Sequence, residues 1–323
     1  MSVLPGVMAV VAVAVLSACT ARVGGLPTAA TTLPDELTSE VVFGDLTTIA
    51  PCSLTDPEAF DEYGTAEHAT PESLDYCAIS VDTSGDADVI LSIGAFGELS
   101  AQPELEDNRV KGVDGGLWVG QQDDLPSFCS QLLVFPDGVT MQVSGSVVDG
   151  SVDACPMVET GMDYAIEVIQ GRDVEHREPE DGSLLTIDPC SLVEDDDIAA
   201  IPGLSGLSRP DEYPGKHSCF WEQGPGSPVN VRLEFGAGPE PGLYTQGGAE
   251  GLVGGRQSAT NRYPEVGENS YCSVETGHIE FDEGEDVVEI ASVYARAPGG
   301  QVDAACAAAT AVAELVWPEL PEA

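Results

Sequence analysis

Nine cysteines constrain most strongly how this 323-residue chain folds. Eight of them divide into two sets of four, and the spacing of the first set resembles that of the second. The first set is separated by 25, 52 and 26 positions, and the second by 29, 53 and 34. The eight positions are Cys52, Cys77, Cys129, Cys155, Cys190, Cys219, Cys272 and Cys306. This pattern predicts two stretches of similar structure, each held by two disulfides.

Short sequence blocks repeat in the same order as the cysteines. Residues 48–54, 112–116, 127–130 and 153–155 correspond to residues 186–192, 251–255, 270–273 and 303–306. We interpret this as a tandem duplication, with the polar, charged segment 171–182 as the linker. The predicted organisation is a signal peptide at 1–18, a flexible lipid-anchored tether at 19–45, a first domain at 46–170, that linker, and a second domain at 183–323.

Each copy combines strand patterns with terminal helices. Short acidic helices are expected at 56–63 and 194–200, and closing helices at 154–169 and 304–316. Strands are expected at 76–81, 89–96, 130–135 and 139–143 in the first copy, and at 219–221, 229–235, 278–281 and 287–294 in the second. The apolar faces of the closing helices are predicted to hold Val158, Met162, Ala165, Ile166 and Ile169, and Ala305, Ala308, Val312 and Leu315. The expected fold class is α+β, with two similar domains, each an antiparallel sheet with N- and C-terminal helices.

Four cysteines allow three pairings in each copy. We favour first with second and third with fourth, because the first bridge would fasten the opening helix to a hairpin. The second bridge would fasten a strand to the closing helix. Such bridges form in an oxidising compartment outside the cytosol.

The first 18 residues have the character of a secretory signal. They contain no charged side chain, and their apolar run at 7–16 is shorter than the roughly 20 residues that span a bilayer. The run ends in Leu16-Ser17-Ala18-Cys19, which resembles a bacterial lipobox, where small residues precede a cysteine that is diacylated. We therefore predict lipidation at Cys19 and a location on the outer face of the plasma membrane.

A signal peptide cut near the same place, with Cys19 as a stray thiol, is the alternative. Lipidation is favoured because Cys19 lies outside the two sets of four, and an unpaired thiol in a secreted protein needs its own explanation. The segment lacks the Lys or Arg that usually opens a signal. Either its beginning is weakly marked or the true start lies upstream.

The charge balance excludes one class of partner. The chain has 56 acidic and 11 basic residues, with Lys111 and Lys216 as its lysines. Nucleic-acid binding depends on Lys and Arg displacing counterions from phosphates, so no nucleic-acid partner is expected. A solvated acidic surface that maintains solubility is favoured over cation capture, because the acids are spread along the chain.

Several of these features together resemble a known family. The Pro-Cys-Ser-Leu opening of each copy, Ser218-Cys219-Phe220-Trp221, the closing helices and the lipobox are similar to actinobacterial lipoproteins of the domain-of-unknown-function 3558 family. The first copy has Ala78 and Ile79 where the second has its aromatic pair, so the resemblance is closer in the second copy. It implies an envelope location and an actinobacterial source, and the family carries no established activity.

No catalytic, metal or cofactor motif stands out in the sequence. The histidines His68, His176, His217 and His278 are scattered, and we interpret His217 as a histidine beside a structural disulfide. The acidic segment 82–88 lacks the calcium-loop pattern and is predicted to be a hairpin turn. Glycine pairs at 115–116 and 254–255 are interpreted as turns that need positive φ, rather than as the border of a ligand groove.

Two classes of function are consistent with these observations. The first, which we favour, is a non-catalytic binding or interaction module that engages an envelope protein, a wall component or a small ligand. Tandem copies suit this class, because they supply two sites or one long surface. The alternative is a glycan-active envelope hydrolase that uses two carboxylates distant in sequence, one of them with a raised pKa inside a cleft.

Overall fold

The computed structural model describes residues 36–70, 73–83, 87–209, 214–224, 227–281 and 286–322. These residues form an α+β structure with two antiparallel sheets, as the sequence predicts. The signal segment 1–18 and Cys19 lie outside the described residues. The described residues after position 35 belong to one compact unit of the chain.

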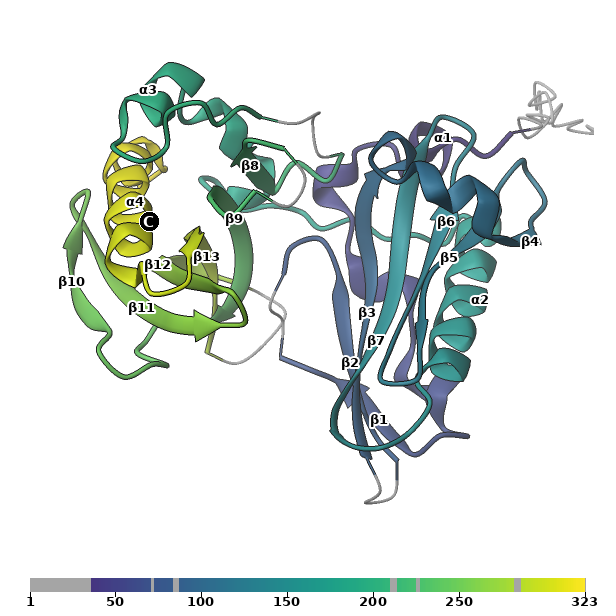
Figure 1. Cartoon of the computed structure of the whole chain (residues 1–323). Helices are drawn as coiled ribbons and strands as arrows, with labels where there is room; N and C mark the ends of the chain where they lie inside the picture. The colour runs from purple at the N-terminus through teal and green to yellow at the C-terminus, as the bar shows by residue number, and fades with distance from the viewer. Residues whose placement is uncertain are drawn as a thin grey trace, which may run out of the picture. The chain divides into compact units, whose positions relative to one another are not determined.

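The first sheet has seven strands in the order β1-β2-β3-β7-β6-β5-β4 (Figure 1). The strands are β1 Thr65–His68, β2 Cys77–Asp82, β3 Ala87–Glu98, β4 Arg109–Gly112, β5 Trp118–Leu125, β6 Phe128–Val134 and β7 Val139–Gly150. The predicted hairpin over segment 82–88 is confirmed, since β2 and β3 pair antiparallel with Asp82 opposite Asp88. Along β3 and β7, alternate residues are buried, so one face of the sheet contributes to an apolar core.

The second sheet has six strands in the order β10-β11-β12-β13-β9-β8. The strands are β8 Ser218–Glu222, β9 Asn230–Pro239, β10 Ala249–Val253, β11 Arg256–Val266, β12 Asn269–Glu280 and β13 Val287–Pro298. Written from its other end, this order is β8-β9-β13-β12-β11-β10. Six strands of the first sheet, β2-β3-β7-β6-β5-β4, follow the same sequence of connections.

Each sheet carries one long helix against its apolar face. The α-helices are α1 Ser39–Phe43, α2 Cys155–Gly171, α3 Asp195–Ala200 and α4 Val302–Val316. Short 3-10 turns lie at Leu46–Thr48, Pro51–Leu54, Pro57–Phe60, Leu99–Ala101, Pro103–Asn108, Leu184–Thr186, Pro189–Ser191 and Trp317–Glu319. Helix α2 packs on β6 and β7, and α4 packs on β12 and β13 (Figure 1). Trp221 and Trp317 are fully buried in the core of the second sheet.

Both closing helices were predicted, and one detail of their faces differs. All five residues expected on the buried face of α2 are buried there. In α4, Ala305, Ala308 and Val312 are buried, but the prediction for Leu315 is wrong, because its exposure is 39%. Val316 is buried instead, four residues after Val312, so the buried stripe follows the i, i+4 row and leaves Leu315 at its margin.

The folded structure begins earlier than the predicted end of the tether at residue 45. Residues 39–43 form α1, whose N-cap Thr38 accepts a hydrogen bond from the backbone N–H of Val41. Phe43 is buried, with its ring centroid 5.1 Å from that of Phe96. The opening helix predicted at 56–63 is only a 3-10 turn over Pro57–Phe60, and β1 follows it directly. The helix predicted at 194–200 is present as α3.

The predicted linker is hydrogen-bonded to the beginning of the first copy. The backbone N–H of Ala50 donates to the carbonyl of Glu175 at 2.9 Å, and that of Arg177 donates to the carbonyl of Thr48 at 2.7 Å. Ile49 and His176 form an isolated β-bridge between these two bonds. Segment 175–177 is therefore paired with residues 48–50 through an isolated bridge, an arrangement that its polar composition does not indicate.

The cysteines pair as we favoured from their spacing. The bonds are Cys52–Cys77, Cys129–Cys155, Cys190–Cys219 and Cys272–Cys306. In each set of four cysteines the first bond joins a 3-10 turn to a strand, and the second joins a strand to a long helix. None of the described helices is long and apolar enough to cross a membrane.

Candidate functional site

A cavity of about 870 Å³ is lined by residues from both halves of the chain. We call it the main cavity. Its lining comprises Gly97, Glu98, Ser100, Ala101, Gln102, Asp188, Cys190, Ser191, Ser208, Arg209, Pro214, Lys216, Ser218, Phe220, Glu222, Gln223 and Gly224. The end of β3 and the turn after it supply one side, and the turn at Cys190 with strand β8 supplies another. The volume lies within the range of small-molecule sites.

Several charged groups in this lining are engaged by neighbouring residues. The Arg209 guanidinium lies 2.7 Å from an Asp195 carboxylate oxygen and donates to the carbonyl of Cys190 at 2.8 Å. Asp188 accepts the backbone N–H of Cys190 and so caps its 3-10 turn. These groups shape the cavity wall. Lys216, Phe220 and Glu222 add a cation, an aromatic ring and an anion to the lining.

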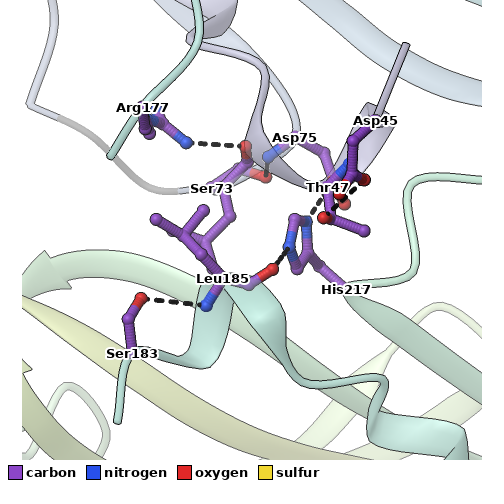
Figure 2. Close-up of polar contacts among 9 residues, drawn as sticks. Asp45, Thr47, Ser73, Asp75, Arg177, Ser183, Leu185 and His217 are labelled. Carbon is purple, nitrogen blue, oxygen red and sulfur yellow. Dashed lines mark hydrogen bonds and ion pairs between the residues drawn. The ribbon is translucent and has the colours of Figure 1, made fainter. Parts of the chain in front are cut away.

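His217 and Asp75 form a buried pair (Figure 2), and His217 stands in the chain between Lys216 and Ser218 of the cavity lining. His217 is 1% exposed, and its Nδ1 lies 2.6 Å from a carboxylate oxygen of Asp75, a residue 142 positions away. Its Nε2 lies 3.0 Å from the carbonyl oxygen of Leu185. We call this pair the His217–Asp75 clasp, because it joins a residue that precedes β2 in the first sheet to one that precedes β8 in the second.

Both ring nitrogens of His217 therefore face acceptors. A neutral imidazole has one N–H, whereas the imidazolium has two, so only the charged ring donates to both Asp75 and Leu185. Burial opposes that charge, but the hydrogen bond and the charge of Asp75 outweigh it, and the pKa of His217 is raised above its usual 6.5. The hydrogen bond to the Leu185 carbonyl raises it further, and the Arg177 guanidinium lowers it.

The clasp is supported by contacts on the side of Asp75. The hydroxyl of Ser73 accepts the backbone N–H of Asp75, and the Arg177 guanidinium donates to the carbonyl of Leu74 at 3.0 Å (Figure 2). Leu74 is 1% exposed and belongs to the apolar cluster of the second sheet, together with Leu185. The apolar contacts of the Leu74 side chain and the hydrogen bond from Arg177 to its carbonyl thus both hold segment 73–75 in place.

A histidine oriented by a carboxylate also occurs in catalytic triads, but this pair lacks the geometry for that role. A general base needs a ring nitrogen directed at the group that it deprotonates. In His217 one nitrogen is bonded to Asp75 and the other to a backbone carbonyl. The arrangement favours a structural clasp over catalysis.

Two other carboxylates have raised pKa values, as the hydrolase alternative requires of one acid. Glu234 on β9 and Glu275 on β12 both face Ser292 of β13 across the sheet, which puts their Cα atoms roughly 10 Å apart by strand spacing. Burial raises the pKa of each, and in Glu234 the Arg232 guanidinium opposes this. Neither carboxylate lines the main cavity, and we assign them no catalytic role.

The remaining residues considered from the sequence are placed as follows. His68 Nδ1 lies 3.4 Å from Cys77 Sγ, but that sulfur is bonded to Cys52, so the three side chains do not offer the thiolates of a zinc site. His176 Nδ1 contacts the hydroxyl of Thr48, and His278 Nε2 contacts the carbonyl of Gly182. The glycine pairs form the turns β4–β5 and β10–β11, and all four have positive φ, as predicted.

The main cavity and Asp75 were missed from the sequence. Asp75 is one of 56 acidic residues, and nothing in its neighbourhood marks it as a partner of a histidine 142 positions away. His217 had a weak signal, since it stands two residues before Cys219. Searches against family models, curated proteins and solved structures found no match.

Proposed function

We propose that this chain is a cell-envelope lipoprotein that binds a small polar ligand in the main cavity without catalysis. The observation that carries the ligand-binding part is the cavity itself, which both halves of the chain line with a mixture of charged, polar and aromatic side chains. The engaged nitrogens of His217 support a binding role rather than chemistry. The anchor rests on the lipobox-like sequence at Cys19 and on the resemblance to actinobacterial envelope lipoproteins.

A tandem duplication is part of this proposal. The shared order of six strands, the equivalent disulfides and the equivalent glycine turns all support it. On this proposal, two copies joined by a short segment form a concave region that residues of both copies line. Binding sites are commonly formed at such junctions.

The lining favours a ligand that carries both signs of charge. Glu98 and Glu222 suit an ammonium group, Lys216 suits a carboxylate, and Phe220 offers an apolar surface. A purely anionic ligand would be disfavoured by the net charge of −45. Short zwitterionic peptides, such as those released from a cell wall, fit this description.

We expect the zwitterion D-alanyl-D-alanine to stabilise the mature protein against heat in a concentration-dependent manner, because a ligand that binds only the folded state raises its stability. N-acetyl-D-alanyl-D-alanine, which lacks the ammonium, and neutral N-acetylglucosamine are the matched probes and should shift the midpoint less. Phe220→Ala should abolish the shift, whereas Tyr244→Ala, at an exposed position outside the cavity lining, should retain it. Equal shifts in both variants, or none with any probe, would count against the proposed site.

The anchor predicts a modified amino terminus. Mass spectrometry of the protein from the membrane fraction should find its first residue to be Cys19 carrying a diacylglyceryl group, since two long chains are what gives stable attachment. Cys19→Ala should release the protein into the soluble fraction while the four disulfides still form. An unmodified Cys19 in membrane-bound protein would contradict the assignment.

A further inference from the structure

The His217–Asp75 clasp lies directly beside the main cavity. Lys216 and Ser218, the two neighbours of His217 in the chain, both line it. The backbone carbonyl of His217 accepts the N–H of Phe235 at 2.8 Å, so the histidine is fixed to β9 as well as to Asp75. A change in the clasp is therefore transmitted to the wall of the cavity through adjacent peptide bonds.

We propose that the clasp is a proton-dependent latch on the main cavity. With His217 doubly protonated, Asp75 holds segment 216–218 in place and the cavity keeps its shape. Loss of one proton breaks the hydrogen bond to Asp75 or the one to Leu185 and so loosens the cavity wall. This inference rests on the proposed function for its biological meaning, but the latch itself is tested without any ligand.

The geometry makes the proton necessary. If the imidazole becomes neutral, either the Asp75 carboxylate or the Leu185 carbonyl loses its donor. Both acceptors are buried, with Asp75 8% and Leu185 4% exposed, so water does not readily replace the missing bond. A buried group without a partner carries the full cost of its desolvation, and the structure can recover that cost by opening.

The charged groups around the ring come from several segments. Asp75 precedes β2, and Arg177 reaches the neighbouring Leu74 carbonyl from the predicted linker. On β9, burial raises the pKa of Glu234, and the Arg232 guanidinium lowers it. The charge of Asp75 raises it by a smaller amount. Lys216 is exposed. The hydrogen bonds from Thr47 are the main cause of the lowered pKa of Asp45, and the charge of Lys216 adds to their effect. Asp75 is the charged partner that directly bonds the ring.

The direction of the pH effect follows from the raised pKa of His217. In the unfolded or opened chain the ring titrates near 6.5, whereas in the closed state it holds its proton to higher pH. The clasp therefore contributes fully below about pH 6.5, and its contribution is lost as pH rises through the folded-state pKa. The wall of the main cavity is therefore expected to be held firmly in mild acid and more loosely in mild alkali.

Asp75→Asn separates a latch from a static structural pair. An asparagine amide can donate to the unprotonated Nδ1 of a neutral imidazole, while Nε2–H still donates to the Leu185 carbonyl. Both hydrogen bonds survive without a titrating charge. If the clasp is a latch, the wall of the main cavity in this variant keeps its shape across the pH range. His217→Gln, which also lacks a titrating group, serves as a second variant.

The experiment measures a distance between the two sheets as pH changes. Nitroxide labels are attached at Val148→Cys on β7 and Leu252→Cys on β10, both exposed positions away from the cavity lining, in the full mature lipoprotein in detergent micelles. Pulsed electron–electron double resonance is recorded over a pH series that begins below the ordinary histidine pKa of 6.5 and continues into mild alkali. We expect a single narrow distance distribution at low pH that broadens at high pH.

The labelled Asp75→Asn protein should keep the narrow distribution throughout, with circular dichroism confirming that it is folded. A distribution in the unsubstituted protein that does not change with pH would overturn the latch, as would equal broadening in Asp75→Asn. If Asp75→Asn fails to fold, the same comparison is made with His217→Gln. Ligand binding plays no part in this readout, so failure of the latch and failure of the ligand proposal are distinguishable.

Discussion

His217→Ala is expected to lower the free energy of unfolding by about 3–5 kcal/mol in mild acid, because it leaves the Asp75 carboxylate buried without its partner. The Leu185 carbonyl also loses its donor. Urea denaturation followed by tryptophan fluorescence measures the loss, since Trp221 and Trp317 are fully buried in the second core. The difference between the variant and the unsubstituted protein should shrink as pH rises through the raised pKa of His217.

A double variant supplies the control. Replacing both partners with leucine removes the pair without leaving a buried charge, and substitutions of this kind are often close to neutral. The double variant should therefore be more stable than His217→Ala alone. If His217→Ala lowers the free energy of unfolding by less than about 1 kcal/mol, the pair contributes no more than an exposed ion pair does. That result would contradict the role inferred from its burial.

Removal of the Cys272–Cys306 disulfide is expected to cost about 3–4 kcal/mol, because the bond closes a loop between residues 34 positions apart. The bond joins β12 to α4, and both of its cysteines lie in the second core. Alanine is the appropriate replacement for both cysteines, since a serine hydroxyl would be buried without an assured partner. Urea denaturation without reductant gives the difference in unfolding free energy.

The Cys190→Ala, Cys219→Ala variant is a matched comparison. Its disulfide closes a loop of similar length, with a separation of 29 positions, but joins a short 3-10 turn to β8 rather than a helix to the sheet. The chain-entropy account predicts a similar loss for both pairs. A loss below about 1 kcal/mol for the Cys272–Cys306 pair would show that the helix is held by its apolar contacts alone.

The disulfide framework and strands such as β3, β7, β9 and β13 could be predicted from the sequence, because both leave local signals. Cysteine spacing repeats visibly, and strands such as β3 and β9 alternate buried residues with more accessible ones along most of their length. The edge strands β1, β4 and β10 were missed, and so were β5 and β11. The three edge strands are four or five residues long and mostly exposed, so they lack the apolar alternation on which a prediction depends.

The candidate site could not be predicted in the same way. His217 was interpreted as a histidine beside a disulfide, and Cys219 is indeed bonded to Cys190. Its partner Asp75, however, comes from the other half of the chain, and the match between them depends on how the halves pack. The residues next to His217 and Asp75 in the sequence do not indicate how the two halves pack. The main cavity is hidden for the same reason, since its lining combines segments about 90 positions apart or more.

The protonation state of His217 tests the central claim most directly. Long-range proton–nitrogen correlation NMR reports whether each ring nitrogen carries a proton, and His217→Gln assigns the signal among the four histidines. Our account predicts that both nitrogens of His217 are still protonated at the ordinary histidine pKa of 6.5, and that the ring loses a proton only at higher pH, together with the broadening of the label distances. A His217 ring that loses a proton at or below the ordinary histidine pKa of 6.5 would contradict the account.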